Sequence, residues 1–260
     1  MRSYLFEFLI FGLKQARACV FAGSFFVLLL ASNHVQVPGL ARYDFIFLGA
    51  ILLQLILFLV KIESGGEVAM IFLFHLLGLL LELYKTNPAI GSWSYPEAAF
   101  FKLGTVPLYS GFMYAAVGSY ISQSWKVMRL RLTGYPPRAW SIMLSILIYG
   151  NFFTDHFLPD IRWFLIPLIF IVFWKTRVYF TVVAQERWMP LGVAFALIAF
   201  FIWIAENIAT YLGAWKYPAQ AIAWHAVGSE KITSWFLLVI ISFFIVEFLK
   251  MVRARTKQPR

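Results

Sequence analysis

The sequence predicts an all-α fold, a polytopic transmembrane helical bundle of about eight spans. Three observations lead to this fold class. Hydrophobic residues make up 62% of the chain and charged residues 13%, whereas about 25% of the residues in soluble domains are charged. Several apolar runs reach the roughly 20 residues that a helix needs to cross a bilayer. Lysine and arginine gather in short clusters between these runs, the distribution that the positive-inside rule describes.

Eight apolar segments are each long enough for a membrane span, and short polar connections separate them. The segment ahead of them, residues 3–16, is expected to lie in the membrane interface or to extend the first span. No small-x-small cleavage site follows the first apolar stretch, so we do not expect a cleaved signal peptide. Residues 1–260 are predicted to form a single integral-membrane domain. The expected spans are residues 17–33, 43–61, 66–84, 104–123, 138–155, 161–180, 188–211 and 230–250.

The basic residues predict which side of the membrane each connection faces. With eight spans, 16 lysines and arginines fall on the side of the two termini and 6 on the other side. Both termini are therefore expected to be cytoplasmic. The formal net charge of +10 then reflects membrane topology, and no nucleic-acid partner is predicted. We expect basic clusters such as Lys126-Val-Met-Arg129-Leu-Arg131 to meet anionic lipids at the cytoplasmic face.

One aromatic turn occurs twice, each time after an apolar segment that carries a glutamate. The first turn reads Gly91-Ser-Trp93-Ser-Tyr95-Pro96 and follows Glu82; the second reads Gly213-Ala-Trp215-Lys-Tyr217-Pro218 and follows Glu206. This recurrence predicts an internal repeat. An even number of spans separates the copies, so the repeats are expected to be parallel, with both turns facing outward. The copies cover approximately residues 66–123 and 188–250.

Ionisable side chains inside apolar segments are costly, which makes each one a candidate for function. His75 and Glu82 are seven positions apart, so they share a helix face about two turns apart. Gly78 lies between them and allows another helix to approach closely. We expect Glu206 to approach Glu82. It is costly for two carboxylates to be ionised together in a poorly hydrated site, so one of them keeps its proton. The protonated group can then act as an acid and the ionised group as a base. The predicted catalytic residues are Glu82, Glu206 and His75; the alternatives are a structural pair of glutamates and a core histidine.

Four aromatic residues of the two turns and one amide next to Glu206 are predicted to bind a substrate. The aromatic rings would line its entrance. The alternative is that they anchor the turns at the membrane interface, where tryptophan and tyrosine are common. The predicted substrate-binding residues are Trp93, Tyr95, Asn207, Trp215 and Tyr217.

No metal and no other cofactor is predicted. His34, His156 and His225 fall on the outer side of the predicted topology, but no pair of them has a ligand-like spacing. Cys19 is the single cysteine, which excludes an intrachain disulfide and a cysteine metal cluster. The sequence has no glycine-rich phosphate loop and no serine-centred nucleophile motif.

These motifs resemble an uncharacterised bacterial integral-membrane family that carries a domain of unknown function. The stretch from Phe74 to Lys85, which contains His75 and Glu82, carries the resemblance together with the first aromatic turn. The resemblance covers nearly the whole chain. It implies a multi-pass protein of the bacterial inner (plasma) membrane and supplies no activity. Further matching stretches are 106–114, 205–210, 213–218 and 234–236.

A weaker similarity is to the membrane-bound carotenoid cyclases and hydratases, whose helices pair an acidic residue with a downstream Gly-x-Trp-x-aromatic turn. Glu206 with Gly213-Ala-Trp215-Lys-Tyr217 carries it best. Those cyclases place a Pro-x-Glu-Glu segment on the next helix. This chain reads Pro107-Leu-Tyr109-Ser110 in one copy and Lys231-Ile-Thr233-Ser234 in the other. The similarity implies a shared architecture, and the missing acidic pair argues against cyclase activity itself.

Three functions follow from these observations. The first is a cofactor-independent acid–base enzyme for a membrane lipid or isoprenoid-like substrate, similar to a cyclase, hydratase or isomerase. The second is a proton-coupled small-molecule transporter, with His75 and the two glutamates as the proton relay. The third is a non-catalytic membrane scaffold in which the glutamates are structural.

Overall fold

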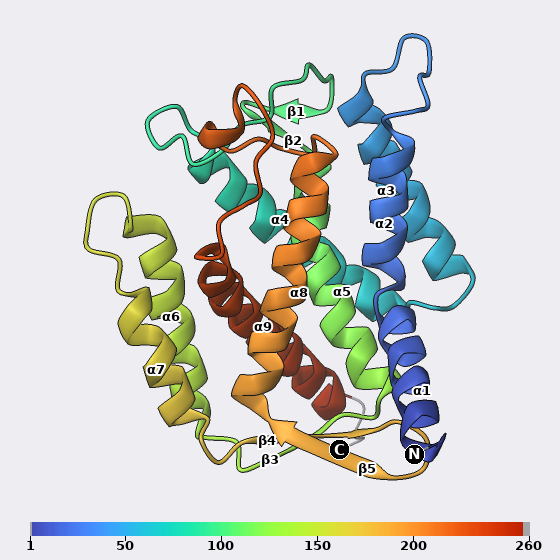
Figure 1. The fold of residues 1–260 in the computed structure, drawn as a ribbon, viewed down its shortest axis with the longest axis vertical. Coiled ribbons are helices and arrows are strands. Elements are labelled where there is room, and N and C mark those ends of the chain that lie inside the picture. Colours follow the sequence, from blue (N-terminus) through green and yellow to red (C-terminus); the bar gives the residue numbers. More distant parts are fainter. Residues whose placement is uncertain (1, 257–260) are drawn as a thin grey trace. The chain divides into compact units, whose positions relative to one another are not determined.

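The computed structural model describes the backbone of residues 2–256 and the side chains of residues 4–253. Within this range the chain is mostly helical, as predicted (Figure 1). Two basic residues of the predicted cytoplasmic side, Lys257 and Arg260, lie outside the described residues. The helices are α1 (Arg2–Ala18), α2 (Val20–Ala31), α3 (Arg42–Leu59), α4 (Gly65–Lys85), α5 (Ser110–Val127), α6 (Arg138–Thr154), α7 (Arg162–Val172), α8 (Leu191–Tyr211), α9 (Lys231–Thr256) and the short 3-10 helix η1 (Pro218–Gln220).

Four of the described helices, α3, α4, α8 and α9, are long and apolar enough to cross a membrane. The bent pair of α1 and α2 adds a fifth span if the two helices act as one. This set is typical of a membrane-associated helical protein. The other predicted spans contain α5, α6 and α7, which do not meet the same requirements of length and hydropathy. A total of about eight spans therefore stays a prediction.

The predicted span at residues 161–180 is wrong in its second half. Helix α7 ends at Val172, and strand β4 (Arg177–Thr181) follows it. The polar residues Lys175, Thr176 and Arg177 interrupt the apolar run. The β-branched and aromatic residues after them favour a strand over a helix.

Two small sheets accompany the helices, and the all-α prediction did not include them. β1 (Lys102–Leu103) and β2 (Val106–Pro107) form an antiparallel hairpin. β3 (Arg131–Thr133), β4 and β5 (Glu186–Pro190) form an antiparallel sheet in the order β3-β4-β5. Strands of two to five residues are too short for their alternating pattern to stand out beside long apolar helices.

The chain divides into two compact units, which we describe separately. Helices α5 and α8 each run from one unit into the other. The internal repeat stays a prediction, because the first aromatic turn leads into the β1-β2 hairpin and the second into η1. Unit 1 consists of Met1–Ala18, Ile121–Ile204 and Gly228–Arg260, and unit 2 of Cys19–Tyr120 and Ala205–Val227.

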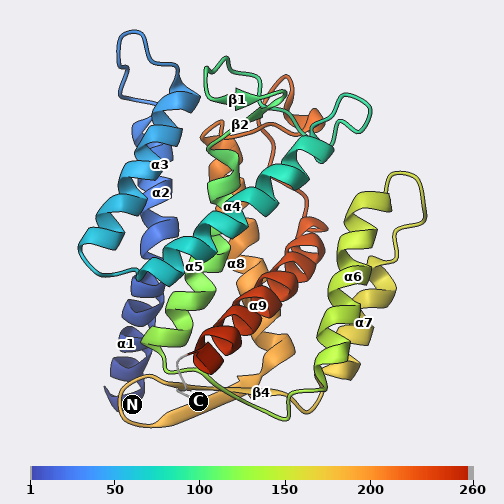
Figure 2. The ribbon, with the colours of Figure 1, turned by 180° about the vertical axis from the view of Figure 1, so that it is seen from behind.

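Aromatic side chains fill the core of unit 1, where α6, α7 and α9 pack against one another. Phe170 stacks on Phe236 with ring centroids 5.5 Å apart, and Phe195 meets Phe243 edge-on at 5.2 Å. The β3-β4-β5 sheet lies across the end of this unit at which α6 begins and α7 ends (Figures 1 and 2). The unit therefore ends in a sheet whose strands connect its helices.

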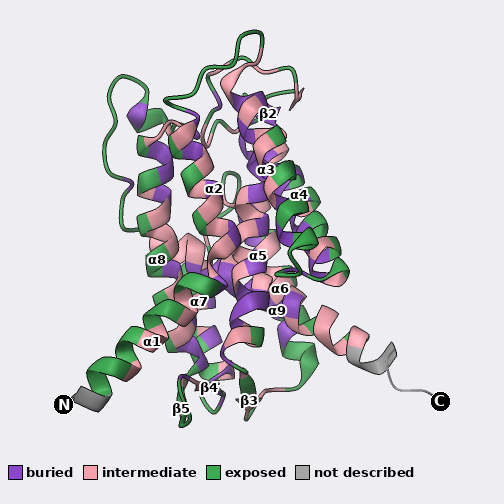
Figure 3. Ribbon diagram, turned by 90° about the vertical axis from the view of Figure 1, so that its right-hand side faces the viewer, coloured by how far each residue is buried: buried purple, intermediate pink, exposed green. Residues whose placement is uncertain are grey.

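In unit 2, α4 and α5 pack closely at glycines. A Cβ atom at Gly78 of α4 would lie 2.6 Å from the ring of Tyr114 of α5. A Cβ atom at Gly111 of α5 would lie 2.5 Å from the carbonyl oxygen of His75. Residues of α5 are mostly buried or half-buried (Figure 3). The close approach predicted at Gly78 is confirmed, and it brings polar groups of α5 next to α4.

Candidate functional site

Glu82 lies near the end of α4, and its side chain is buried, with 2% of the residue exposed. Its Oε2 accepts hydrogen bonds from Trp93 Nε1 at 2.7 Å and from the Tyr95 hydroxyl at 2.8 Å. Its Oε1 accepts one from the Tyr114 hydroxyl at 2.8 Å. All three donors are neutral. An unpaired buried carboxylate is costly, so these hydrogen bonds are what allows Glu82 to sit in an apolar segment.

The first aromatic turn brings two of these donors back to α4. Gly91 opens the turn with a φ of +60°, a conformation that glycine adopts without steric cost. Burial and, after it, the charge of Glu82 raise the pKa of Tyr95 well above its usual value. The Tyr95 hydroxyl therefore keeps its proton at neutral pH and can donate it to the hydrogen bond with Glu82.

Glu206 of α8 has the same relation to the second aromatic turn, and it is 3% exposed. Its Oε1 accepts a hydrogen bond from the Tyr217 hydroxyl at 2.6 Å. Gly213 opens this turn with a φ of +73°, as Gly91 opens the first. Burial and then the charge of Glu206 raise the pKa of Tyr217 well above its usual value. Each glutamate thus accepts a hydrogen bond from a tyrosine of the turn that follows its own helix.

The two turns are joined to each other. Ser94 and Lys216, which occupy the same position in the two turns, form an antiparallel bridge with N–H···O distances of 2.9 and 3.0 Å. The rings of Trp93 and Tyr217 meet edge-on with centroids 6.1 Å apart. The structure therefore brings the two predicted glutamates into one arrangement. This glutamate–aromatic cluster consists of Glu82, Glu206, Trp93, Tyr95, Tyr114 and Tyr217.

The remaining two predicted substrate-binding residues lie beside this cluster. Asn207 follows Glu206, and its Oδ1 accepts a hydrogen bond from the backbone N–H of Val227 at 2.8 Å. Trp215 is buried in the second turn, with 7% of the residue exposed. The Asn207 hydrogen bond holds the chain segment that follows the second turn. A role for either residue in binding a substrate stays a prediction.

His75 lies on α4 two turns before Glu82 and is 6% exposed. Its ring packs against Phe112 at a centroid distance of 4.4 Å and against Phe72 at 5.9 Å. Its Nδ1 has no hydrogen-bond partner among the described residues. A buried polar atom without a partner is unusual, so the structure leaves His75 with an unused nitrogen in an aromatic environment.

Two residues of this region were not predicted to contribute to the site. No sequence pattern indicated a role for Tyr114, and Arg42 counted only as a basic residue in the prediction of membrane topology. Arg42 donates to the carbonyl oxygens of Leu212 at 2.6 Å and Gly213 at 3.2 Å, and it forms an ion pair with Glu97. It thus ties the start of α3 to both aromatic turns. One signal was available: Arg42 is among the few basic residues on the predicted outer side, where the positive-inside rule disfavours them.

Sequence reasoning also missed another buried carboxylate in unit 2. Glu63 is 1% exposed, and its Oε1 accepts a hydrogen bond from the Ser119 hydroxyl at 2.9 Å. The side-chain amide of Gln54 donates to its Oε2. Glu63 lies in the polar turn between two apolar segments, a position that suggests exposure. Its burial depends on α3 and α5, which the local sequence does not reveal.

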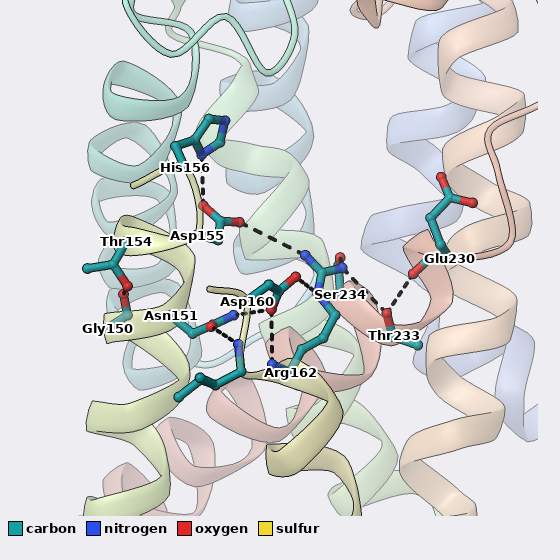
Figure 4. A network of polar contacts seen from close by, with 11 residues as sticks. Gly150, Asn151, Thr154, Asp155, His156, Asp160, Arg162, Glu230, Thr233 and Ser234 are labelled. Carbon is teal, nitrogen blue, oxygen red and sulfur yellow. Dashed lines mark hydrogen bonds and ion pairs between the residues drawn. The ribbon is translucent and has the colours of Figure 1, made fainter. Parts of the chain in front are cut away.

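A polar network in unit 1 joins the α6–α7 hairpin to α9 (Figure 4). The Arg162 guanidinium forms an ion pair with Asp160 and donates to the Ser234 hydroxyl at 2.8 Å. Nδ1 of His156 lies 2.8 Å from an oxygen of Asp155. In the part of the chain that the structure describes, no group of three or more His, Cys, Asp or Glu residues is placed to hold a metal ion.

Asp160→Asn is expected to remove part of the acid sensitivity of the fold. Burial raises the pKa of Asp160, but hydrogen bonds from Arg162 and Asn151 and the Arg162 charge outweigh it and lower the pKa overall. The unfolded side chain has a pKa of about 3.9, so the stabilisation is present above that pH and is lost as the pH falls through the lower folded pKa.

At neutral pH the variant should be less stable by about 1 kcal/mol or less, as for a partly exposed ion pair. The difference from the unmodified protein should close as the pH falls below the folded pKa. Thermal unfolding in detergent, followed from neutral to acidic pH, measures this. A difference that stays constant over the whole range contradicts the assignment.

The chemistry open to the glutamate–aromatic cluster depends on its hydroxyl groups. A tyrosine hydroxyl both donates and accepts hydrogen bonds. If Glu82 takes up a proton, the hydroxyl of Tyr95 or Tyr114 can turn to accept a hydrogen bond from it, so the added proton has an acceptor inside the cluster. Trp93 donates from the edge of its indole ring, and the face of an indole ring attracts a cation. The cluster can therefore exchange a proton and stabilise positive charge.

Residues 7–243 of the chain match the family described as "Protein of unknown function (DUF817)". The chain belongs to this family. The uncharacterized protein YoaT of Bacillus subtilis (strain 168) is similar to it, with 47% identity over 246 residues that cover 95% of this chain and 92% of YoaT. No solved structure matches the chain. The resemblance to a family of unknown function is confirmed as DUF817, whereas the similarity to carotenoid cyclases is not shown.

Proposed function

We propose that this DUF817 protein is a membrane enzyme that performs acid–base chemistry, without a cofactor, on a lipid or isoprenoid. The observation that supports it most is the glutamate–aromatic cluster. Two buried carboxylates, from α4 and α8, each accept a hydrogen bond from a tyrosine hydroxyl. An acid and a base in one poorly hydrated site suit proton transfer to and from carbon.

The proposed reaction begins when one carboxylic acid protonates a carbon–carbon double bond of the substrate. The cation that forms loses a proton from a neighbouring carbon to the other carboxylate, so the double bond moves and the number of protons balances. Capture of the cation by a second double bond forms a ring and moves the positive charge to another carbon, and capture by water gives a protonated alcohol. In both cases the other carboxylate then takes up one proton and a neutral product results. The faces of Trp93 and Trp215 are the candidates to stabilise the cation. None of these steps requires an electron acceptor.

The proposal includes the setting of the protein. We place it in the bacterial inner membrane as a multi-pass protein with cytoplasmic termini and both aromatic turns outward, on the charge count above. α4 and α8 are both long and apolar enough to span a bilayer, so a hydrophobic substrate can reach the site from the lipid. An internal parallel repeat gives a reason why Ser94 and Lys216, equivalent positions of the two turns, pair with each other.

Lipid and isoprenoid extracts from cells test this function. Deleting the gene and overexpressing it should change the amount of one lipid or isoprenoid in opposite directions, measured by mass spectrometry. Overexpression of Glu82→Gln should leave that compound at its basal level. Glu230→Gln, which removes the same charge from an exposed residue, should behave as the unmodified protein. Unchanged extracts in both strains count against the enzyme.

The buried His75 favours a second candidate, a proton-coupled transporter. Its unpartnered Nδ1 lies on the same helix as Glu82, as a relay of intramembrane protonatable groups requires. Solute flux driven by a pH gradient in proteoliposomes would then fall in His75→Gln and in Glu206→Gln. Flux that is absent, or unaffected by both changes, leaves the enzyme as the better account. Loss of folding in both variants instead favours the scaffold.

A further inference from the structure

We infer that unit 1 binds the phosphate headgroup of an anionic phospholipid in a pocket beside Lys175, at the edge of the β3-β4-β5 sheet. The site lies in unit 1 and shares no residue with the glutamate–aromatic cluster. It therefore stands independently of the proposed enzyme activity. It narrows the general expectation that basic clusters meet anionic lipids to one pocket and one occupant.

The pocket combines an apolar wall with a cation. It has a volume of about 450 Å³. The end of α7 supplies the apolar wall, where Ile171 is 72% exposed and Trp174 is 80% exposed. Lys175 follows directly and is also exposed. Such an arrangement suits an amphiphile, with an acyl chain along the apolar wall and a phosphate at the lysine. The lining residues are Gly134, Pro136, Ile171, Val172, Trp174 and Lys175.

The turn after β3 fixes the opposite wall of the pocket. Gly134 has a φ of +65°, and a Cβ atom there would lie 2.3 Å from the carbonyl oxygen of Lys175. The Thr176 hydroxyl donates to the carbonyl oxygen of Gly134 at 2.9 Å. Only glycine allows the backbone at residue 134 to come this close to the Lys175 carbonyl oxygen. The turn after β3 and the end of α7 are therefore held at a fixed separation.

The sheet face next to the pocket is cationic and aromatic. Arg131, Arg177, Tyr179 and Trp188 alternate with buried or half-buried residues along the three strands. The Arg131 guanidinium lies 4.3 Å from the centre of the Tyr179 ring, and that of Arg177 lies 4.1 Å from the centre of the Trp188 ring. Arg131 also forms an ion pair with Glu186 on the same face, at 2.7 Å, whereas the stacked Arg177 remains able to donate hydrogen bonds to phosphate.

The opposite face of the sheet is already occupied by α1. The Arg187 guanidinium donates to both carboxylate oxygens of Glu7, at 2.9 and 2.8 Å, and the ring of Phe180 lies 5.8 Å from that of Phe11. The Lys14 ammonium donates to the carbonyl oxygen of Thr181 at 2.9 Å. Helix α1 thus packs on the face opposite Arg177 and Trp188.

An anionic lipid fits this surface better than a soluble polyanion. The pocket opens where the apolar helix α7 ends at Val172, close to Lys175 and Arg177, two basic residues of the predicted cytoplasmic side. Headgroups of anionic lipids concentrate at that level, and lysine and arginine attract them. Ile171 and Trp174 give an acyl chain a contact that a nucleic acid or an acidic peptide does not need.

Native mass spectrometry of the full chain in detergent tests the site. The protein is mixed with phosphatidylglycerol or, as a neutral lipid, phosphatidylcholine, and the retained lipid is counted. Lys175→Gln with Arg177→Gln should weaken phosphatidylglycerol retention about tenfold or more. The control double variant, Lys250→Gln with Arg253→Gln, removes the same charge from α9 and should change phosphatidylglycerol retention less than about twofold. Lys175→Arg should retain the lipid.

Any of four outcomes contradicts this site. Two concern the variants: both double variants lose phosphatidylglycerol equally, or the Lys175 and Arg177 variant retains it fully. The other two concern the ligand: the protein retains both lipids equally, or glycerol phosphate or inorganic phosphate displaces the lipid at an equal concentration. The last identifies a soluble phosphate as the ligand instead. Trp174→Ala keeps both charges and tests the apolar wall separately. It should shorten the lifetime of the bound lipid, and thermal unfolding of every variant checks that the fold is intact.

Discussion

Replacing Glu82 by glutamine is expected to lower substrate conversion at least about a hundredfold while the protein stays folded, because general acid–base catalysis contributes about 10²–10⁴. Glutamine has nearly the same shape but does not exchange a proton near neutral pH. Its carbonyl oxygen can accept the hydrogen bonds from Trp93 and Tyr95, as Oε2 does. Its amide can donate to the Tyr114 hydroxyl, which turns to accept.

Glu82→Ala is the comparison that separates chemistry from structure. It leaves the donors of Tyr95, which is buried, and of Trp93 and Tyr114, which are half-buried, without this acceptor, and a buried unsatisfied donor costs about 1–3 kcal/mol. The alanine variant should therefore unfold at a clearly lower temperature than the glutamine variant. Thermal unfolding of both variants, together with conversion measured in isolated membranes, provides the test. Wild-type conversion by Glu82→Gln would remove Glu82 from the mechanism, and equal destabilisation of both variants would make its role structural.

The parts of this molecule that could be predicted from sequence are those that local pattern determines. Apolar length located α3, α4, α8 and α9, and the cost of burying a carboxylate marked Glu82 and Glu206 as unusual. The recurring glycine and aromatic residues marked the two turns, where Gly91 and Gly213 do adopt a positive φ. Equivalent spacing also suggested that the glutamates belong to one site, and the structure places them in one cluster.

The parts that could not be predicted depend on contacts between distant segments. Tyr114 reaches Glu82 because Gly78 lets α5 lie against α4, and no local pattern gives the rotation of α5 that this requires. Arg42 joins both turns from a third helix. β4 was hidden because Val178, Tyr179 and Phe180 follow the apolar run of α7 closely in the sequence, and strand pairing with β3 and β5 decided its conformation.

The contact between α4 and α5 also supports the second large prediction, which concerns stability. Gly111→Ala should destabilise unit 2 and reduce activity with it, because α5 would have to move away from α4. That movement would take the Tyr114 hydroxyl out of reach of Glu82, to which it is now bonded at 2.8 Å. The expected loss is about 1–3 kcal/mol or more, the usual cost of adding a methyl group to a packed core.

Three glycine variants measured in the same detergent test this packing. A Cβ atom at Gly111 meets the backbone oxygen of His75 at 2.5 Å, which cannot move without α4, whereas one at Gly118 meets only the ring of Phe74 at 2.5 Å. Gly23 of α2 has no heavy atom within 4 Å of its added Cβ, so alanine there should stabilise the helix by about 0.5–1 kcal/mol. Unfolding temperatures should therefore rise from Gly111→Ala through Gly118→Ala to Gly23→Ala. If Gly111→Ala unfolds no earlier than Gly23→Ala, α4 and α5 are not in contact at His75, and the hydrogen bond that Tyr114 gives Glu82 loses its structural basis.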